Sequence, residues 1–185
     1  MAVRSARPVI PAAGAEVIKL VTLPSIRLTV ALTWAVTVLL GPADPPGGVV
    51  QYCRVGVLVL GVLAAGHEYP GQIGATLLAV PRRPLLAVAK PVALVVTAGP
   101  AVLVAALLAG EPGATGGLLL DLLLAAGVAT VVRHPVGATA VLLTAYQIVV
   151  PLIRAQLPAV ALPPAPAWAA AIVATAAVTF CLRDA

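Results

Sequence analysis

Residues 49–66 read VVQYCRVGVLVLGVLAAG, an apolar run that contains a single charged side chain, Arg54. A helix needs about 20 apolar residues to cross the ~30 Å of hydrocarbon in a bilayer, and this run approaches that length. A strand of a membrane β-barrel would alternate polar and apolar residues, which this run does not do. The stretch therefore predicts a transmembrane helix.

The composition of the whole chain agrees with this interpretation. Of its 185 residues, 62% are hydrophobic and 9% are charged, and the mean hydropathy is +1.12. Soluble domains carry about 25% charged residues, and disordered chains combine low hydrophobicity with high charge. Both classes are therefore excluded, and a single integral membrane domain over residues 1–185 is expected.

Five further apolar stretches accompany residues 49–66, and glycine and proline separate them, as at Gly41-Pro42. Pro91 and Pro100 fall inside the third stretch and are expected to kink its helix, because proline removes a backbone hydrogen bond. The expected fold is all-α, an integral membrane bundle of six transmembrane helices over residues 25–40, 49–66, 85–109, 118–132, 135–153 and 167–182.

The basic side chains set the expected orientation. With six spans and the N-terminus inside, nine of the eleven Lys and Arg residues lie on the cytoplasmic side, and only Arg54 and Arg154 lie toward the outside. Cytoplasmic loops of membrane proteins carry such an excess, so both termini of a multi-pass cell-membrane protein are expected in the cytoplasm. Nucleic acid is not an expected partner, because an aromatic content of 3% leaves no platform on which bases stack.

The segment before the first span is amphipathic. Within residues 15–23, Glu16, Lys19 and Thr22 recur every three residues, and apolar side chains fall on another face. This pattern predicts an interfacial helix at the membrane surface, and an ordinary cytoplasmic lead-in fits it equally well. A signal peptide fits less well, because 27 residues precede the apolar core at 28–40 and no small-x-small cleavage site follows.

Two charged side chains of opposite sign fall inside the apolar stretches at similar depth. Arg54 lies five residues beyond Val49, about 7.5 Å of helical rise, and Asp121 lies three residues beyond Leu118. Because an unpaired charge in hydrocarbon is costly, we expect these two side chains to pair; a role in substrate passage is the other interpretation. Lys90, near the inner end of the third stretch, is expected to extend to the membrane surface.

The sequence contains none of the common catalytic motifs. It has no GxxxxGK[ST] phosphate-binding loop, no HExxH and no GxSxG elbow. Cys53 and Cys181 form no CxxC pair, and the expected topology places them at opposite membrane faces, too far apart for a disulfide. We therefore expect no enzyme activity, no metal site and no cofactor bound by this chain.

The longest cytoplasmic loop, residues 67–84, carries an apolar stripe at helical spacing, Ile73, Leu77 and Val80, and ends near Arg82 and Arg83. Such a stripe fits a groove on a partner protein; alternatively, it lies on membrane lipid and the arginines meet headgroups. The loop also contains a longer motif, Glu68-Tyr69-x-Gly71-x-Ile73-x-x-Thr76-Leu77-x-x-x-Pro81-Arg82-Arg83, with Lys90 downstream.

This motif resembles the permease subunit of actinobacterial ABC-2-type transporters, and the lead-in with Glu16 and Lys19 resembles the N-terminal segment of the same permeases. In that family two permeases form the pathway, and a separate cytoplasmic ATPase binds ATP and Mg. The resemblance implies that this chain contacts the ATPase through its lead-in and its 67–84 coupling loop. The residues implied in that contact are Glu16, Lys19, Glu68, Tyr69, Gly71, Ile73, Thr76, Leu77, Pro81, Arg82 and Arg83.

The implied function is that of an ABC exporter permease, working as a homodimer or heterodimer and driven by ATP hydrolysis on the partner subunit. Its cargo is not readable from the sequence. The alternative is a non-transport membrane protein, such as an immunity or assembly factor, built on the same bundle. An ATPase gene beside this one on the chromosome would favour the transporter.

Overall fold

The computed structural model describes residues 14, 17–18, 20–43, 48–66, 83–156 and five positions between 171 and 178. Within these ranges the regular structure is helical and no strand occurs, which confirms the all-α expectation. The helices are α2 (Pro24–Leu40), α3 (Val49–Gly66), α5 (Arg83–Leu108), α6 (Thr115–Val132), α7 (Pro135–Thr144) and α8 (Val150–Gln156). Two 3-10 turns, Gly41–Ala43 and Pro112–Ala114, follow α2 and precede α6, and a π-helical turn, Ala145–Val149, joins α7 to α8.

Five helical segments of the described chain are long and apolar enough to cross a membrane: Pro24–Ala43, Val49–Gly66, Ala89–Leu108, Pro112–Val132 and Pro135–Ile153. They coincide with the first five predicted spans. The sixth, residues 167–182, lies mostly outside the described residues, with helical backbone at 171, 172, 174, 175 and 178. The lead-in at 15–23 is also described in part, as helix at 17, 18 and 20–22.

Two helices begin a few residues before the spans predicted for them. Helix α5 begins at Arg83, so the loop placed at 67–84 ends earlier; Pro84 fits the first helical turn, where its missing N–H is not needed. Helix α6 begins at Thr115, three residues before the predicted span at 118–132, and runs through Gly116 and Gly117. The reason is that the 3-10 turn Pro112–Ala114 already directs the backbone into the helix.

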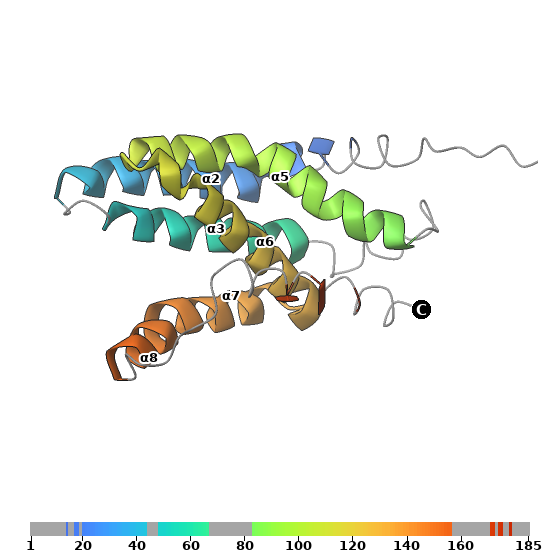
Figure 1. The fold of residues 1–185 in the computed structure, drawn as a ribbon. Helices are drawn as coiled ribbons and strands as arrows, with labels where there is room; N and C mark the ends of the chain where they lie inside the picture. The colour runs from blue at the N-terminus through green and yellow to red at the C-terminus, as the bar shows by residue number, and fades with distance from the viewer. Residues whose placement is uncertain are drawn as a thin grey trace, which may run out of the picture.

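Helix α5 contains both Pro91 and Pro100 and changes direction along its length in Figure 1. Proline removes a backbone hydrogen bond and clashes with the preceding turn, which is a common cause of helix bends. The expected kink of this helix is therefore observed.

The helices form three layers (Figure 1). Helices α2 and α5 lie on one side, α3 and α6 in the middle, and α7 with α8 on the other side. Helix α3 packs most extensively against α6 and also contacts α2, α5 and α7. Consecutive long helices run in opposite directions, so the α2–α3 and α5–α6 connections and the end of α8 lie at one end of the bundle, called the α2–α3 end below.

Small residues let α3 occupy this central position. A Cβ atom on Gly61 would lie 2.5 Å from the Leu122 carbonyl oxygen in α6, and one on Gly56 would overlap the Thr33 side chain in α2. Glycine at such points allows helix backbones to approach closely, as is common in membrane bundles. The helices around α3 then bury an aliphatic core that includes Val57, Leu60, Leu94, Val102, Leu118 and Leu122.

The surface of the bundle is also aliphatic. Helices α2, α5 and α7 and the π-helical turn expose large apolar side chains, among them Leu28, Leu32, Leu39, Val92, Val96, Leu107, Val136, Val141 and Ile148. Monomeric soluble proteins rarely expose apolar patches of such extent. A surface of this kind is suited to lipid, so the chain is a membrane-embedded protein.

Candidate functional site

Helices α3 and α6 bring together the two charges that the sequence places inside the membrane. Arg54 Nε donates a hydrogen bond to Asp121 Oδ2 over 2.8 Å. The Asp121 side chain is 6% exposed, and that of Arg54 is 35% exposed. The predicted pairing is thus confirmed, and it forms within one chain. A buried carboxylate requires such a partner, because removing a charge from water costs several kcal/mol.

A tyrosine of the fifth span completes the surroundings of Asp121. Tyr146 Oη donates to Asp121 Oδ1 over 2.8 Å, so each carboxylate oxygen accepts one hydrogen bond. The guanidinium carbon of Arg54 lies 5.9 Å from the centroid of the Tyr146 ring, within the range of cation–π attraction. Nothing in the sequence pattern singled out Tyr146.

Tyr146 lies in the π-helical turn Ala145–Val149, in which the Val150 N–H bonds to the carbonyl of Ala145. Pro151 follows directly. In an α-helix the proline ring would clash with the carbonyl four residues earlier, that of Gln147, and the helix is widened over that residue. Single π turns inside α-helices frequently occur at functional sites.

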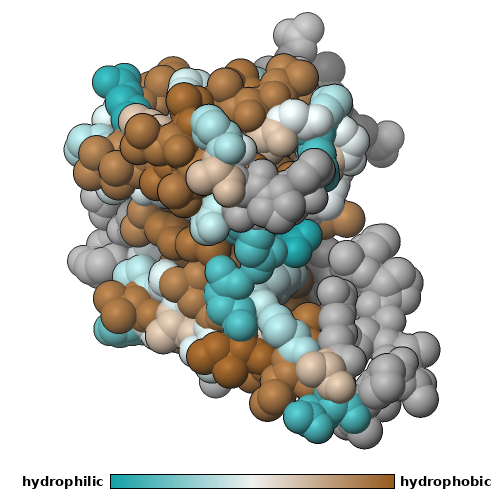
Figure 2. Space-filling view, turned by 90° about the vertical axis from the view of Figure 1, so that its left-hand side faces the viewer, coloured by the Kyte–Doolittle hydropathy of each residue, from teal (hydrophilic) through white to brown (hydrophobic). Residues whose placement is uncertain are grey.

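Two glutamines extend these contacts toward the α2–α3 end. Arg54 Nη1 donates to Gln51 Oε1 over 3.4 Å, and Gln51 Nε2 donates to Gln147 Oε1 over 2.6 Å. Gln51 and Arg54 are three residues apart, so they share one face of α3. We call Gln51, Arg54, Asp121, Tyr146 and Gln147 the polar network. Figure 2 looks onto this end of the bundle, where hydrophilic residues gather near the centre of a largely hydrophobic face.

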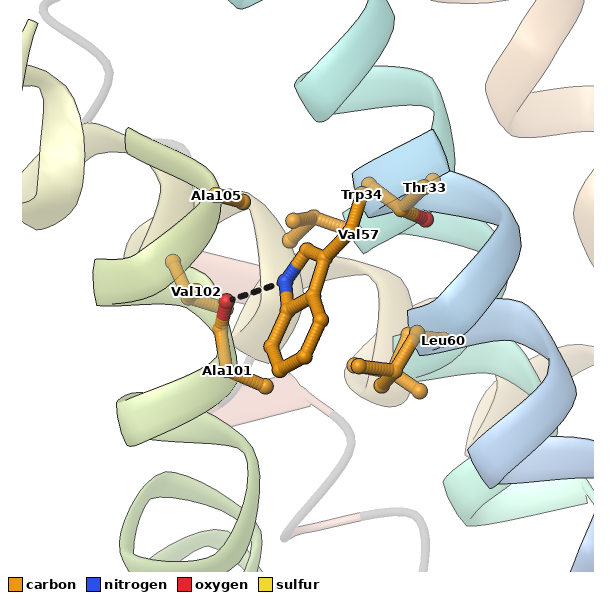
Figure 3. A pocket seen from close by; sticks show the side chains of 9 residues that line it. Thr33, Trp34, Val57, Leu60, Ala101, Val102 and Ala105 are labelled. Atoms are coloured by element: carbon orange, nitrogen blue, oxygen red, sulfur yellow. Dashed lines mark hydrogen bonds between the residues drawn. The ribbon is translucent and has the colours of Figure 1, made fainter. Parts of the chain in front are cut away.

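A second set of polar contacts joins α2, α3 and α5. The buried Thr37 Oγ1 lies 3.2 Å from Cys53 Sγ, which donates to the carbonyl of Ala105 over 3.6 Å. Trp34 Nε1 donates to the carbonyl of Ala101 over 3.1 Å, across a small apolar pocket (Figure 3). The pocket is lined by Val30, Thr33, Trp34, Gly56, Val57, Leu60, Ala101, Val102 and Ala105. These contacts join α2, α3 and α5. No charged side chain lines the pocket.

The structure describes two of the remaining candidate residues, Lys90 and Arg83. Lys90 is half-buried in the second turn of α5, at the opposite end of the bundle. Arg83 is the first residue of α5. The other residues assigned to ATPase coupling lie outside the described residues: Glu16, Lys19, Glu68, Tyr69, Gly71, Ile73, Thr76, Leu77, Pro81 and Arg82.

The polar network is therefore the main chemical feature of the described part of the chain. It offers one buried carboxylate, one partly exposed guanidinium, a phenol and two amides. No cluster of three or more His, Cys, Asp or Glu side chains that could hold a metal ion is found among the residues described. The chain matches no protein-family model, no curated protein and no solved structure.

Proposed function

We propose that this chain is the membrane-spanning permease subunit of an ABC-2-type exporter, which forms a pathway with a second permease and is driven by a separate cytoplasmic ATPase. The observation that carries the proposal is the motif from Glu68 to Arg83, which connects the second span to the third. A bundle of apolar helices with a polar network inside it supports the proposal, since charges within spans commonly mark transport pathways.

The connectivity suggests how ATP hydrolysis would reach the pathway. Residues 67–82 join the end of α3 at Gly66 to the start of α5 at Arg83. A displacement of this loop by the ATPase would therefore act on both helices at once. Helix α3 has 18 residues, about 27 Å at helical rise. It carries Gln51 and Arg54 at its far end, so a shift of α3 would change their bonds to α6 and to the π-helical turn.

The test is a substitution in the loop. Leu77→Asp places a charge in the apolar stripe and should release a co-purified ATPase encoded beside this chain, or uncouple its ATP hydrolysis from transport. Ala75→Asp is the matched control, because helical spacing puts residue 75 on the side away from Ile73 and Leu77. This control should retain the ATPase.

Equal retention of the ATPase by both variants, with ATP hydrolysis still coupled to transport in both, would show that this loop is not the coupling element. If no ATPase associates with the unaltered chain either, the alternative of a non-transport membrane protein is favoured. Insertion of each variant should be checked by its recovery in the membrane fraction and by its helical circular dichroism.

A further inference from the structure

The polar network differs between its acidic and basic ends. Asp121 is buried, and both of its oxygens accept hydrogen bonds, from Arg54 and Tyr146. The basic end is accessible: Arg54 is 35% exposed, and the contact between Gln51 and Gln147 lies at the surface. A pair that served only to neutralise charge would not require an accessible guanidinium beside two amides.

The direction of the hydrogen bonds can be assigned. Arginine has no acceptor, so Gln51 must present its oxygen to Arg54 and its amide nitrogen to Gln147. Gln147 therefore accepts through its oxygen, and its NH₂ group is the end of the chain of bonds. Among the described residues, no acceptor is found for that NH₂ group.

Arg54 has unused donors as well. A guanidinium carries five N–H donors, and the two described bonds of Arg54 use one on Nε and one on Nη1. Three N–H groups remain without an acceptor among the residues that the structure describes. They are one N–H on Nη1 and two on Nη2, because Asp121 is bound through Nε, and a guanidinium presents one N–H of each of these nitrogens along its Nη1 and Nη2 edge. This edge has the geometry that binds carboxylate or phosphate with two parallel hydrogen bonds.

We propose that the exposed end of the polar network is a recognition site for an oxyanion, a phosphate or carboxylate group, with Arg54 and Gln147 as its donors. Every side-chain oxygen of Gln51, Asp121 and Gln147 already accepts a bond, whereas donors of Arg54 and Gln147 remain without an acceptor among the described residues. Arg54 lies about 7.5 Å along α3 from the α2–α3 end. That depth is reached by a lipid headgroup or by an anionic solute entering from this end.

The experiment uses the full chain in a neutral detergent and compares two isosteric changes. Gln147→Glu retains the oxygen that accepts from Gln51 but replaces the NH₂ group, for which the described residues supply no acceptor, with negative charge. Gln156→Glu makes the same change on the exposed end of α8, outside the polar network. The probes are inorganic phosphate and didecanoyl phosphatidylglycerol, and didecanoylglycerol is the neutral control.

Binding of at least one anionic probe should weaken tenfold or more in Gln147→Glu and change less than twofold in Gln156→Glu. Tight binding of the lipid alone identifies a headgroup site, and binding of phosphate alone identifies a site for soluble oxyanions. If Gln147→Glu does not fold, Gln147→Met removes the amide without adding charge and should weaken binding at least threefold. The proposal is overturned if neither probe binds the unaltered chain, or if the two positions respond alike.

This assay needs no ATPase. Failure of the oxyanion site would leave the proposed permease function untouched, and failure of ATPase coupling would leave the oxyanion site untouched.

Discussion

Replacing Arg54 with leucine should destabilise the chain more than replacing Arg54 and Asp121 together. The single change leaves the Asp121 carboxylate, whose side chain is 6% exposed, with only the Tyr146 hydroxyl as a partner. Removing one member of a buried ion pair costs about 3–5 kcal/mol. Because Arg54 is itself one-third exposed, we expect the lower end of this range, about 3 kcal/mol.

The reverse change should cost less. In Asp121→Leu the remaining arginine can extend toward the nearby end of α3, which limits the cost of leaving it unpaired. The Tyr146 hydroxyl loses its acceptor, so we expect the change to cost about 1–2 kcal/mol. The double replacement leaves only that hydroxyl unpaired, at about 1 kcal/mol. The two single effects together are therefore about 3–4 kcal/mol larger than the effect of the double change.

The measurement is the free energy of unfolding in mixed micelles, titrated with a denaturing detergent and followed by circular dichroism. Gln156→Leu, an exposed change on α8 away from the polar network, is the control and should lie within about 0.5 kcal/mol of the unaltered chain. If the two single effects add to the double effect within about 0.5 kcal/mol, the side chains do not interact energetically and the reasoning fails.

Four further changes, one of them a control, test the packing and the orientation. Gly61→Ala should cost about 2 kcal/mol, because the added carbon would lie 2.5 Å from a backbone carbonyl of α6; Gly117→Ala, with open space around it, should be neutral or stabilising in the same titration. Trp34→Phe should cost about 1 kcal/mol through loss of the indole hydrogen bond to Ala101. A cysteine at Thr76 in a background without other cysteines should not react with an impermeant maleimide added from outside, and reaction there would contradict the expected orientation.

The positions of the spans could be predicted because each depends on the apolar character of consecutive residues in the sequence. The run at 49–66 is apolar along its whole length, and α3 has the bounds that this run predicts. The pairing of Arg54 with Asp121 could also be inferred, since two opposite charges at one depth have few other partners in hydrocarbon. The start of α5 was placed less well, because proline is compatible both with a loop and with the first turn of a helix.

The sequence by itself determined that this chain forms apolar helices in a membrane and that its two intramembrane charges would pair. Only the tertiary structure decided what surrounds that pair. Tyr146 lies 25 residues from Asp121, and Gln147 lies 96 residues from Gln51, so each contact exists only once three helices have packed. The π-helical turn that holds Tyr146 and Gln147 leaves no periodic pattern in an apolar run. Hydrophobic periodicity in a sequence shows which residues avoid water. The donor-rich end of the polar network depends instead on which side chains the packed helices bring within hydrogen-bonding distance.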